Sequence, residues 1–110
     1  MRAFALVAPI VLWVAGCATD CDEEPRATVE LTDAAGGPIE DALVECTIDG
    51  VPQVVTTLPG LAWCVAQPGT LQMTVEWRGA TVELAAWNVV ERPDQCPAIP
   101  SYRYEVVLVE

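Results

Sequence analysis

From residue 27 onward, apolar and polar residues alternate in short segments that are separated by turn residues. In TLQMTVEW, residues 70–77, every second residue is apolar, and SYRYEVVLV, residues 101–109, begins the same way. A period of two puts alternate side chains on opposite faces of a strand, so these segments predict half-buried β-strands. Because no segment after residue 26 has a helical period, the pattern predicts an all-β fold.

The remaining predicted strands are short and lie between turns. They cover residues 27–32, 42–48, 53–58, 61–66 and 80–85. Asp49-Gly50 and Arg78-Gly79 are typical of tight hairpin turns. Residues 88–100 contain two prolines and predict a loop, with a short strand at Val89-Val90. About seven short strands at this spacing are typical of a seven-stranded-type antiparallel β-sandwich.

The N-terminal residues have the composition of an export signal. Arg2 is the only charged residue before Asp20, and residues 3–15 are all apolar. A short basic start followed by an apolar run is typical of a signal peptide. The run is shorter than the about 20 apolar residues of a transmembrane helix. We therefore expect a signal peptide over residues 1–16.

The end of this apolar run resembles the lipobox of bacterial lipoproteins. In Val14-Ala15-Gly16-Cys17, an aliphatic residue and two small residues precede a cysteine. In lipoproteins the cysteine thiol accepts diacylglycerol, the chain is cut before the cysteine, and the new amino group is acylated. The resemblance implies lipidation of Cys17 and a place in the bacterial cell envelope. Ala18 follows where Asp would favour the inner membrane in enterobacteria, so the outer membrane is favoured. A plain secretory signal and an uncleaved anchor helix are the alternatives.

After cleavage before Cys17, we expect the remaining chain to consist of an acidic tether, residues 17–26, and a domain, residues 27–110. The whole chain carries 5 Lys+Arg and 16 Asp+Glu residues, a formal net charge of −11. A chain this acidic lacks the basic surface that binds nucleic acid, and anionic head groups repel it. The lipid is therefore the expected membrane contact. The DCDEE run of the tether matches no EF-hand spacing, so we expect a solvated spacer.

Four further cysteines follow Cys17 in the sequence: Cys21, Cys46, Cys64 and Cys96. An even number in a small exported domain predicts two disulfides, for which three connectivities can be drawn. We favour Cys46–Cys64, which joins segments close in sequence. The second pair, Cys21–Cys96, would tie the start of the first strand to the loop before the last. No pair has the C-x-x-C spacing of zinc or thioredoxin-type sites.

The sequence proposes no catalytic centre. The chain has no histidine, which removes Ser-His and Cys-His dyads, His-ligated metal sites and the usual proton shuttle near neutral pH. No motif suggests paired catalytic carboxylates or a metal held by oxygen ligands. We therefore expect no enzyme activity, no metal and no cofactor. The expected role is that of a binding or structural module.

Two stretches resemble carboxypeptidase regulatory-like domains, which fold as transthyretin-like (prealbumin-like) sandwiches related in architecture to immunoglobulin-like ones. Residues 33–44, DAAGGPIEDALV, match the D-x-x-G-x-P-[IV]-x-x-A-x-V signature of that family. Residues 68–79 resemble its PG-T-Y-x-L-x-V…G stretch, with Leu71 where Tyr is usual and Ala80 where an aromatic residue follows the glycine. The resemblance implies an accessory, folding or binding module, because the family has no catalytic residues to carry over.

Two tryptophans are candidate binding residues. If Cys64 points inward, Trp63 points to the outer face with Leu61 and Val65. Trp87 breaks the alternation of the segment before it. Together they would form an exposed aromatic patch of the kind that protein-binding and sugar-binding sandwiches use. Packing against the second sheet or the disulfide is the alternative for Trp63. An envelope protein is the first expected partner, and a glycan is the second.

Overall fold

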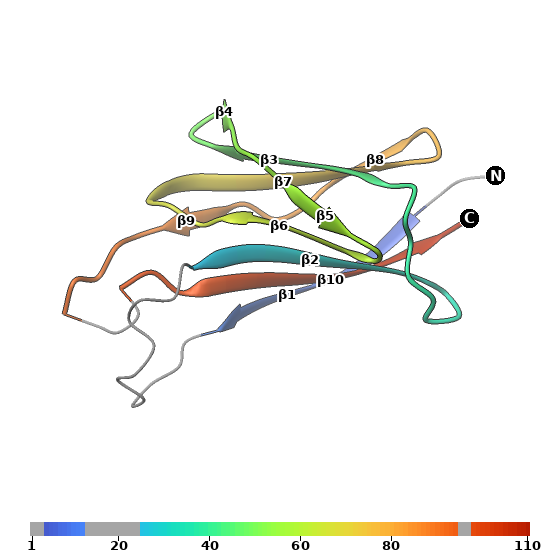
Figure 1. The fold of residues 1–110 in the computed structure, drawn as a ribbon, viewed down its shortest axis with the longest axis horizontal. Helices are drawn as coiled ribbons and strands as arrows, with labels where there is room; N and C mark the ends of the chain where they lie inside the picture. The colour runs from blue at the N-terminus through green and yellow to red at the C-terminus, as the bar shows by residue number, and fades with distance from the viewer. Residues whose placement is uncertain (1–3, 13–24, 95–97) are drawn as a thin grey trace.

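The structure is a computed structural model and describes residues 4–12, 25–94 and 98–110. Two β-sheets pack face to face, and the described residues contain no helix (Figure 1). The predicted all-β sandwich is thereby confirmed. Within these same residues, no helical segment has the length and apolar character needed to cross a membrane.

Sheet A has the strand order β1-β10-β2-β6-β5. Its strands are β1 (Phe4–Leu12), β2 (Arg26–Asp33), β5 (Thr56–Leu58), β6 (Leu61–Val65) and β10 (Ser101–Val109). β10 pairs antiparallel with β1 but parallel with β2. The prediction of a purely antiparallel sandwich is wrong at this pair. The chain between β2 and β10 contains all the strands from β3 to β9, and a connection that long allows parallel pairing, unlike a hairpin.

Sheet B has the order β4-β3-β7-β8, with β9 also paired to β7. Its strands are β3 (Leu43–Ile48), β4 (Val51–Pro52), β7 (Gly69–Trp77), β8 (Ala80–Glu83) and β9 (Trp87–Val89). β8 pairs with the second half of β7 and β9 with its first half. The single strand predicted over residues 80–85 therefore ends early. Where it is interrupted, Gln72 Nε2 donates to the Leu84 carbonyl at 2.5 Å.

The core lies between the two sheets and is formed by the inward rows of the strands. The row on β7 consists of Leu71, Met73, Val75 and Trp77, all buried. The row on β10 consists of Tyr102, Tyr104, Val106 and Leu108, also buried. Both rows are those that the alternation predicts. Removing this apolar surface from water is the main stabilising contribution to a fold of this size.

The two predicted tight hairpins are present. Asp49 and Gly50 have φ angles of 51° and 80°, and Arg78 and Gly79 have 48° and 80°. Positive φ at both central residues is the geometry of a type I′ turn, whose twist matches the strands that it joins. Arg78 occupies this left-handed conformation without the conformational freedom of glycine.

The turn after β2 is built around the Asp33 side chain. Asp33 Oδ1 accepts hydrogen bonds from the amides of Ala35 and Gly37, both at 2.9 Å. The Asp33 carbonyl accepts a third bond from the amide of Gly36, which has a φ of 86°. The first part of the D-x-x-G-x-P pattern is thus a turn in which the aspartate satisfies backbone donors.

We expect Asp33→Ala to lower the free energy of unfolding by about 1–2 kcal/mol, because two amides lose their acceptor. Asp33→Asn keeps an oxygen at the Oδ1 position and should stay within about 0.5 kcal/mol of the wild type. Urea denaturation of the three proteins measures the difference. A loss in the asparagine variant equal to that in the alanine variant would contradict this account of the turn.

β1 lies at the edge of sheet A and adds little to the core. Of its described side chains, Ala5 packs partly against the core, whereas Leu6 is 63 % exposed and Val7 is 37 % exposed. All of the buried core residues whose side chains the structure describes lie at Ala27 or later in the chain. The sequence places residues 4–12 in a signal peptide, whereas the structure pairs them along the whole of β10. Among the described side chains, this segment therefore contributes no fully buried residue to the core.

Candidate functional site

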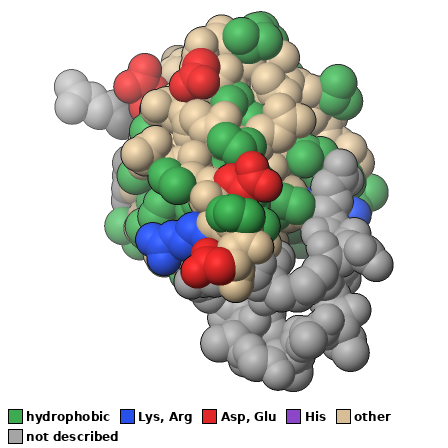
Figure 2. Space-filling view, turned by 90° about the vertical axis from the view of Figure 1, so that its left-hand side faces the viewer, with side chains coloured by type: hydrophobic (Ala, Val, Ile, Leu, Met, Phe, Trp, Pro, Cys, Tyr) green, Lys and Arg blue, Asp and Glu red, His purple; other side chains and the backbone are tan. Residues whose placement is uncertain are grey.

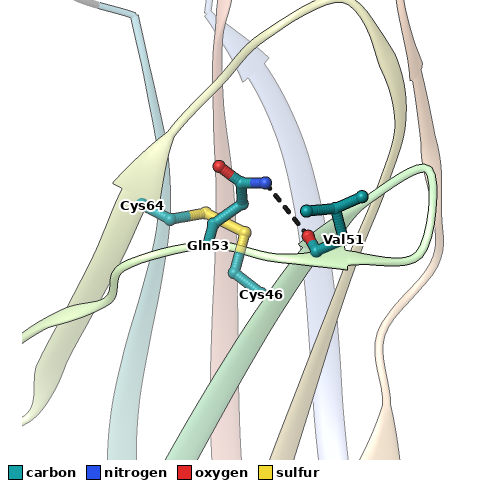
Figure 3. The surroundings of a disulfide bond; sticks show 4 residues. All are labelled: Cys46, Val51, Gln53 and Cys64. Atoms are coloured by element: carbon teal, nitrogen blue, oxygen red, sulfur yellow. Dashed lines mark hydrogen bonds between the residues drawn. A yellow bond between two sulfur atoms is a disulfide. The ribbon is translucent and has the colours of Figure 1, made fainter.

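The predicted pair Cys46–Cys64 forms a disulfide between the two sheets. Cys46 lies on β3 of sheet B and Cys64 on β6 of sheet A, and both are buried (Figure 3). Their Cα atoms are 6.6 Å apart. Gln53 lies beside the bridge, where its side-chain amide donates to the Val51 carbonyl at 3.0 Å (Figure 3). Its backbone amide donates to the carbonyl of Cys46 at 2.8 Å. The disulfide thus joins the two layers directly through the core.

The other three cysteines, Cys17, Cys21 and Cys96, lie outside the described residues. The predicted lipidation site and the predicted second disulfide belong to this part of the chain. Of the predicted tether, the structure describes residues 25 and 26. Arg26 is already the first residue of β2, and the Pro25 carbonyl accepts a bond from the Ala66 amide at 2.9 Å.

Trp63 lies on the outer face of sheet A, as the alternation predicts. On β6, Ala62 and Cys64 are buried, whereas Trp63 and its neighbours of the same parity are half-buried. The guanidinium carbon of Arg26 lies 3.9 Å from the centroid of the Trp63 ring. This cation–π contact covers part of the indole face. Trp63 is therefore a surface residue whose ring is partly covered by the Arg26 side chain.

Trp87 lies on the inner side of the sandwich. Its ring centroid is 5.0 Å from that of Tyr102 and 6.1 Å from that of Tyr104, both of which belong to the inward row of β10. The three rings form a tilted aromatic cluster between β9 and β10. Because Trp63 faces outward from sheet A, the structure does not bring the two predicted tryptophans into one patch.

The aromatic cluster changes how its tyrosines titrate. Burial raises the pKa of the Tyr104 hydroxyl to about 12, and burial also raises the pKa of Tyr102. The Tyr104 hydroxyl donates a hydrogen bond to the Ala85 carbonyl, at the interruption between β8 and β9. The fold therefore favours the neutral form of both tyrosines.

Because burial raises the pKa of Tyr104, the stability of the fold should depend on pH in the alkaline range. A hydroxyl whose pKa is higher in the folded state stabilises the fold fully below the unfolded value of 10.0, and this contribution is lost as pH rises towards about 12. We expect ultraviolet titration of the native protein to show tyrosine ionisation above pH 10. The Tyr104→Phe variant should lack the later of the two steps. Ionisation of both tyrosines at their ordinary pKa in the folded protein would contradict the burial described above.

A cavity of about 690 Å³ lies where the turn after β2 meets the ends of β7 and β10. Asp41 Oδ1 accepts a hydrogen bond from Trp77 Nε1 at 2.9 Å, and this bond is the main cause of the lowered pKa of the Asp41 carboxyl. Arg78 forms ion pairs with Asp41, at 3.6 Å, and with Glu110. The cavity thus combines apolar walls with a guanidinium that already has two carboxylate partners.

The Asp41–Arg78 pair was not among the predicted site residues. In the sequence, Asp41 belongs only to the 33–44 signature, and Arg78 only to a predicted hairpin turn. The two are 37 positions apart, and only the pairing of β7 with β3 brings their segments together. No short-range signal in the sequence reports such a contact. The cavity offers binding surface, but the described lining contains no nucleophile with an adjacent base.

The described residues include no group of three or more His, Cys, Asp or Glu side chains that could hold a metal ion. On the face shown in Figure 2, acidic side chains are separated by hydrophobic and neutral surface. They therefore form no single acidic patch on that face. No protein-family model, curated protein or solved structure matches this chain.

Proposed function

We propose that this protein is a lipoprotein of the bacterial cell envelope, anchored through a lipid on Cys17, that acts as a non-catalytic binding or structural module. The observation that carries the proposal is the sequence Val14-Ala15-Gly16-Cys17 at the end of an apolar run. It combines the small residues that a signal peptidase site needs with the thiol that accepts diacylglycerol. By the same resemblance, the outer membrane is the favoured location.

The packing of β1 is compatible with removal of residues 1–16. The described side chains of β1 are exposed or half-buried, and the buried core starts at Ala27. Cleavage would cost the edge pairing with β10 and the partial packing of Ala5 against the core. It would remove none of the described buried residues, as a lipoprotein precursor requires.

The proposed role is binding or structural because the sequence has no histidine and no catalytic motif. Among binding partners, a protein is favoured over a glycan. Glycan binding on an aromatic platform would need Trp63 and Trp87 on one surface, whereas Trp87 packs against Tyr102 and Trp63 faces the other way. A second disulfide, Cys21–Cys96, would join the tether to the loop before β10 and fix the domain close to its anchor.

Phase partition in a cloud-point detergent tests the anchor. The formal charge of the processed chain is one unit more negative than the −11 of the whole chain, because Arg2 is removed. Such an acidic domain without lipid belongs in the aqueous phase. We expect the protein from cells to enter the detergent phase. The control is residues 18–110 exported with an ordinary signal peptide, which should stay in the aqueous phase. Partition of both proteins into the aqueous phase would reject the lipid anchor.

A further inference from the structure

The edges of the two sheets differ in how well they are protected against pairing with a strand of another molecule. β4 has 2 residues and contains Pro52, and β5 has 3 residues and is followed by Pro59. The edge formed by β8 and β9 is interrupted at residues 84–86. Short, interrupted or proline-containing edges resist the addition of another strand. β10, by contrast, has 9 residues and contains neither proline nor glycine.

In the full chain, β1 covers the outer edge of β10 from Ser101 to Val109. The inference that follows rests on the proposed function, because cleavage before Cys17 removes all of β1. The edge of β10 would then present a row of unpaired backbone N–H and C=O groups. Because β1 pairs antiparallel with β10 from Ser101 to Val109, this edge can accept a strand over its whole length.

We propose that the processed protein forms a dimer in which β10 pairs antiparallel with β10 of a second copy. A two-fold axis perpendicular to the sheet would relate the copies and join the two A sheets into one continuous sheet. Residues directly opposite in an antiparallel pair point to the same face. The inward row of one β10 would therefore continue into the inward row of the other.

The outward charges of β10 select the register of this pairing. If the axis passes through Tyr104, Arg103 of each copy faces Glu105 of the other, and the pair occurs twice by symmetry. An axis through Glu105 would place two carboxylates opposite each other, and an axis through Arg103 would oppose two guanidinium groups. Opposite charges across a strand pair are stabilising, and like charges are destabilising. A shift by one residue is excluded because it would turn the inward row outward.

The surroundings of Glu105 favour a second copy as the occupant. In the parallel pair of β10 with β2, Glu105 lies directly opposite Glu30. Arg103 lies between them, with Nη2 at 2.5 Å from Glu30 and 3.7 Å from Glu105. One guanidinium thus serves two carboxylates, and Glu105 has the longer contact. In the dimer each Glu105 gains the Arg103 of the other copy. The lipid anchor that each copy carries would also concentrate the copies on one membrane surface.

The test uses two copies of the full-length gene, expressed together with different C-terminal tags and extracted from the membrane in mild detergent. Purification on one tag should recover the other wild-type copy. Arg103→Glu in both copies, or Glu105→Arg in both copies, should reduce this recovery by about tenfold, because both cross-strand pairs become like-charged. Arg103→Glu in one copy with Glu105→Arg in the other restores opposite charges at both pairs. This combination should recover the wild-type level, which also shows that both variants fold.

A matched control reverses an exposed charge on the side of sheet B that is away from β8. Glu45 is exposed on β3 of sheet B, whereas β8 is the strand of that sheet that contacts β1, so Glu45→Arg should leave recovery unchanged. Absence of co-purification in a protein whose mass shows that it starts at Cys17 would overturn the dimer and leave the lipid anchor standing. Absence of co-purification in a protein that retains residues 1–16 would overturn both. Equal recovery from the matched and mismatched variants would also reject the pairing.

Discussion

Replacing Cys46 and Cys64 together with alanine is expected to lower the free energy of unfolding by about 3 kcal/mol. The two residues are 18 positions apart, so the bridge removes conformational freedom from the unfolded chain while joining the two sheets in the folded one. In a domain of this size, a loss of that magnitude corresponds to a fall in Tm of about 12–24 °C. Thermal unfolding followed by circular dichroism measures it.

The control for this experiment separates the buried bridge from the proposed second one. The Cys21→Ala, Cys96→Ala double variant should still lose about 3 kcal/mol when Cys46–Cys64 is reduced. Reductant should bring the wild type at least as low as the variant without the Cys46–Cys64 bridge. A melting temperature that does not change on removal of the bridge would show that it contributes nothing to stability.

Replacing Cys17 with alanine is expected to abolish lipid attachment completely. Alanine has no thiol to accept diacylglycerol, and processing of lipoproteins depends on that modification. Cells fed an alkyne fatty acid should therefore yield a labelled wild-type protein and an unlabelled variant. The variant should also run as a longer chain on a gel, because residues 1–16 remain attached.

Cys21→Ala is the matched control, since Cys21 lies four positions further along and outside the lipobox. It should be labelled as strongly as the wild type and should have the same length. Fatty-acid label in the Cys17→Ala protein would contradict the assignment of the anchor. Equal loss of label in both variants would indicate that the label depends on folding rather than on one thiol.

Much of the fold could be predicted from local sequence. The inward rows of β7 and β10 follow from alternation alone, because each strand has one face in the core. The hairpins at Asp49-Gly50 and Arg78-Gly79 follow from the need for positive φ at both positions. The Cys46–Cys64 pair is favoured by its short separation in sequence, and the structure places the two cysteines on strands of opposite sheets.

Long-range pairing could not be predicted in the same way. The parallel pairing of β2 and β10 depends on the path of the whole chain from β3 to β9, which separates the two strands in the sequence. At the interruption between β8 and β9, the Gln72 side chain on the neighbouring strand satisfies the Leu84 carbonyl, a contact that no local pattern encodes. The pairing of β1 with β10 could not be predicted either, because residues 4–12 form an apolar run without alternation, which is also the pattern of a signal peptide.

The positions of the candidate binding residues could be predicted only where they follow from the alternation within one strand. The outward direction of Trp63 follows from the parity of β6, where Cys64 must face its partner. The inward position of Trp87 depends on the interruption of the preceding strand and on the tyrosines of β10. The contact of Asp41 with Trp77 crosses 36 positions, and no local pattern encodes it.

The intact mass of the protein purified from the membrane fraction, before and after reduction and alkylation, tests the central claim most directly. The lipoprotein account predicts a chain that begins at Cys17 and is heavier than its peptide by a diacylglycerol and a fatty acid. The Cys46 and Cys64 thiols should react only after reduction. A chain that begins at any other residue and carries no lipid would contradict the account.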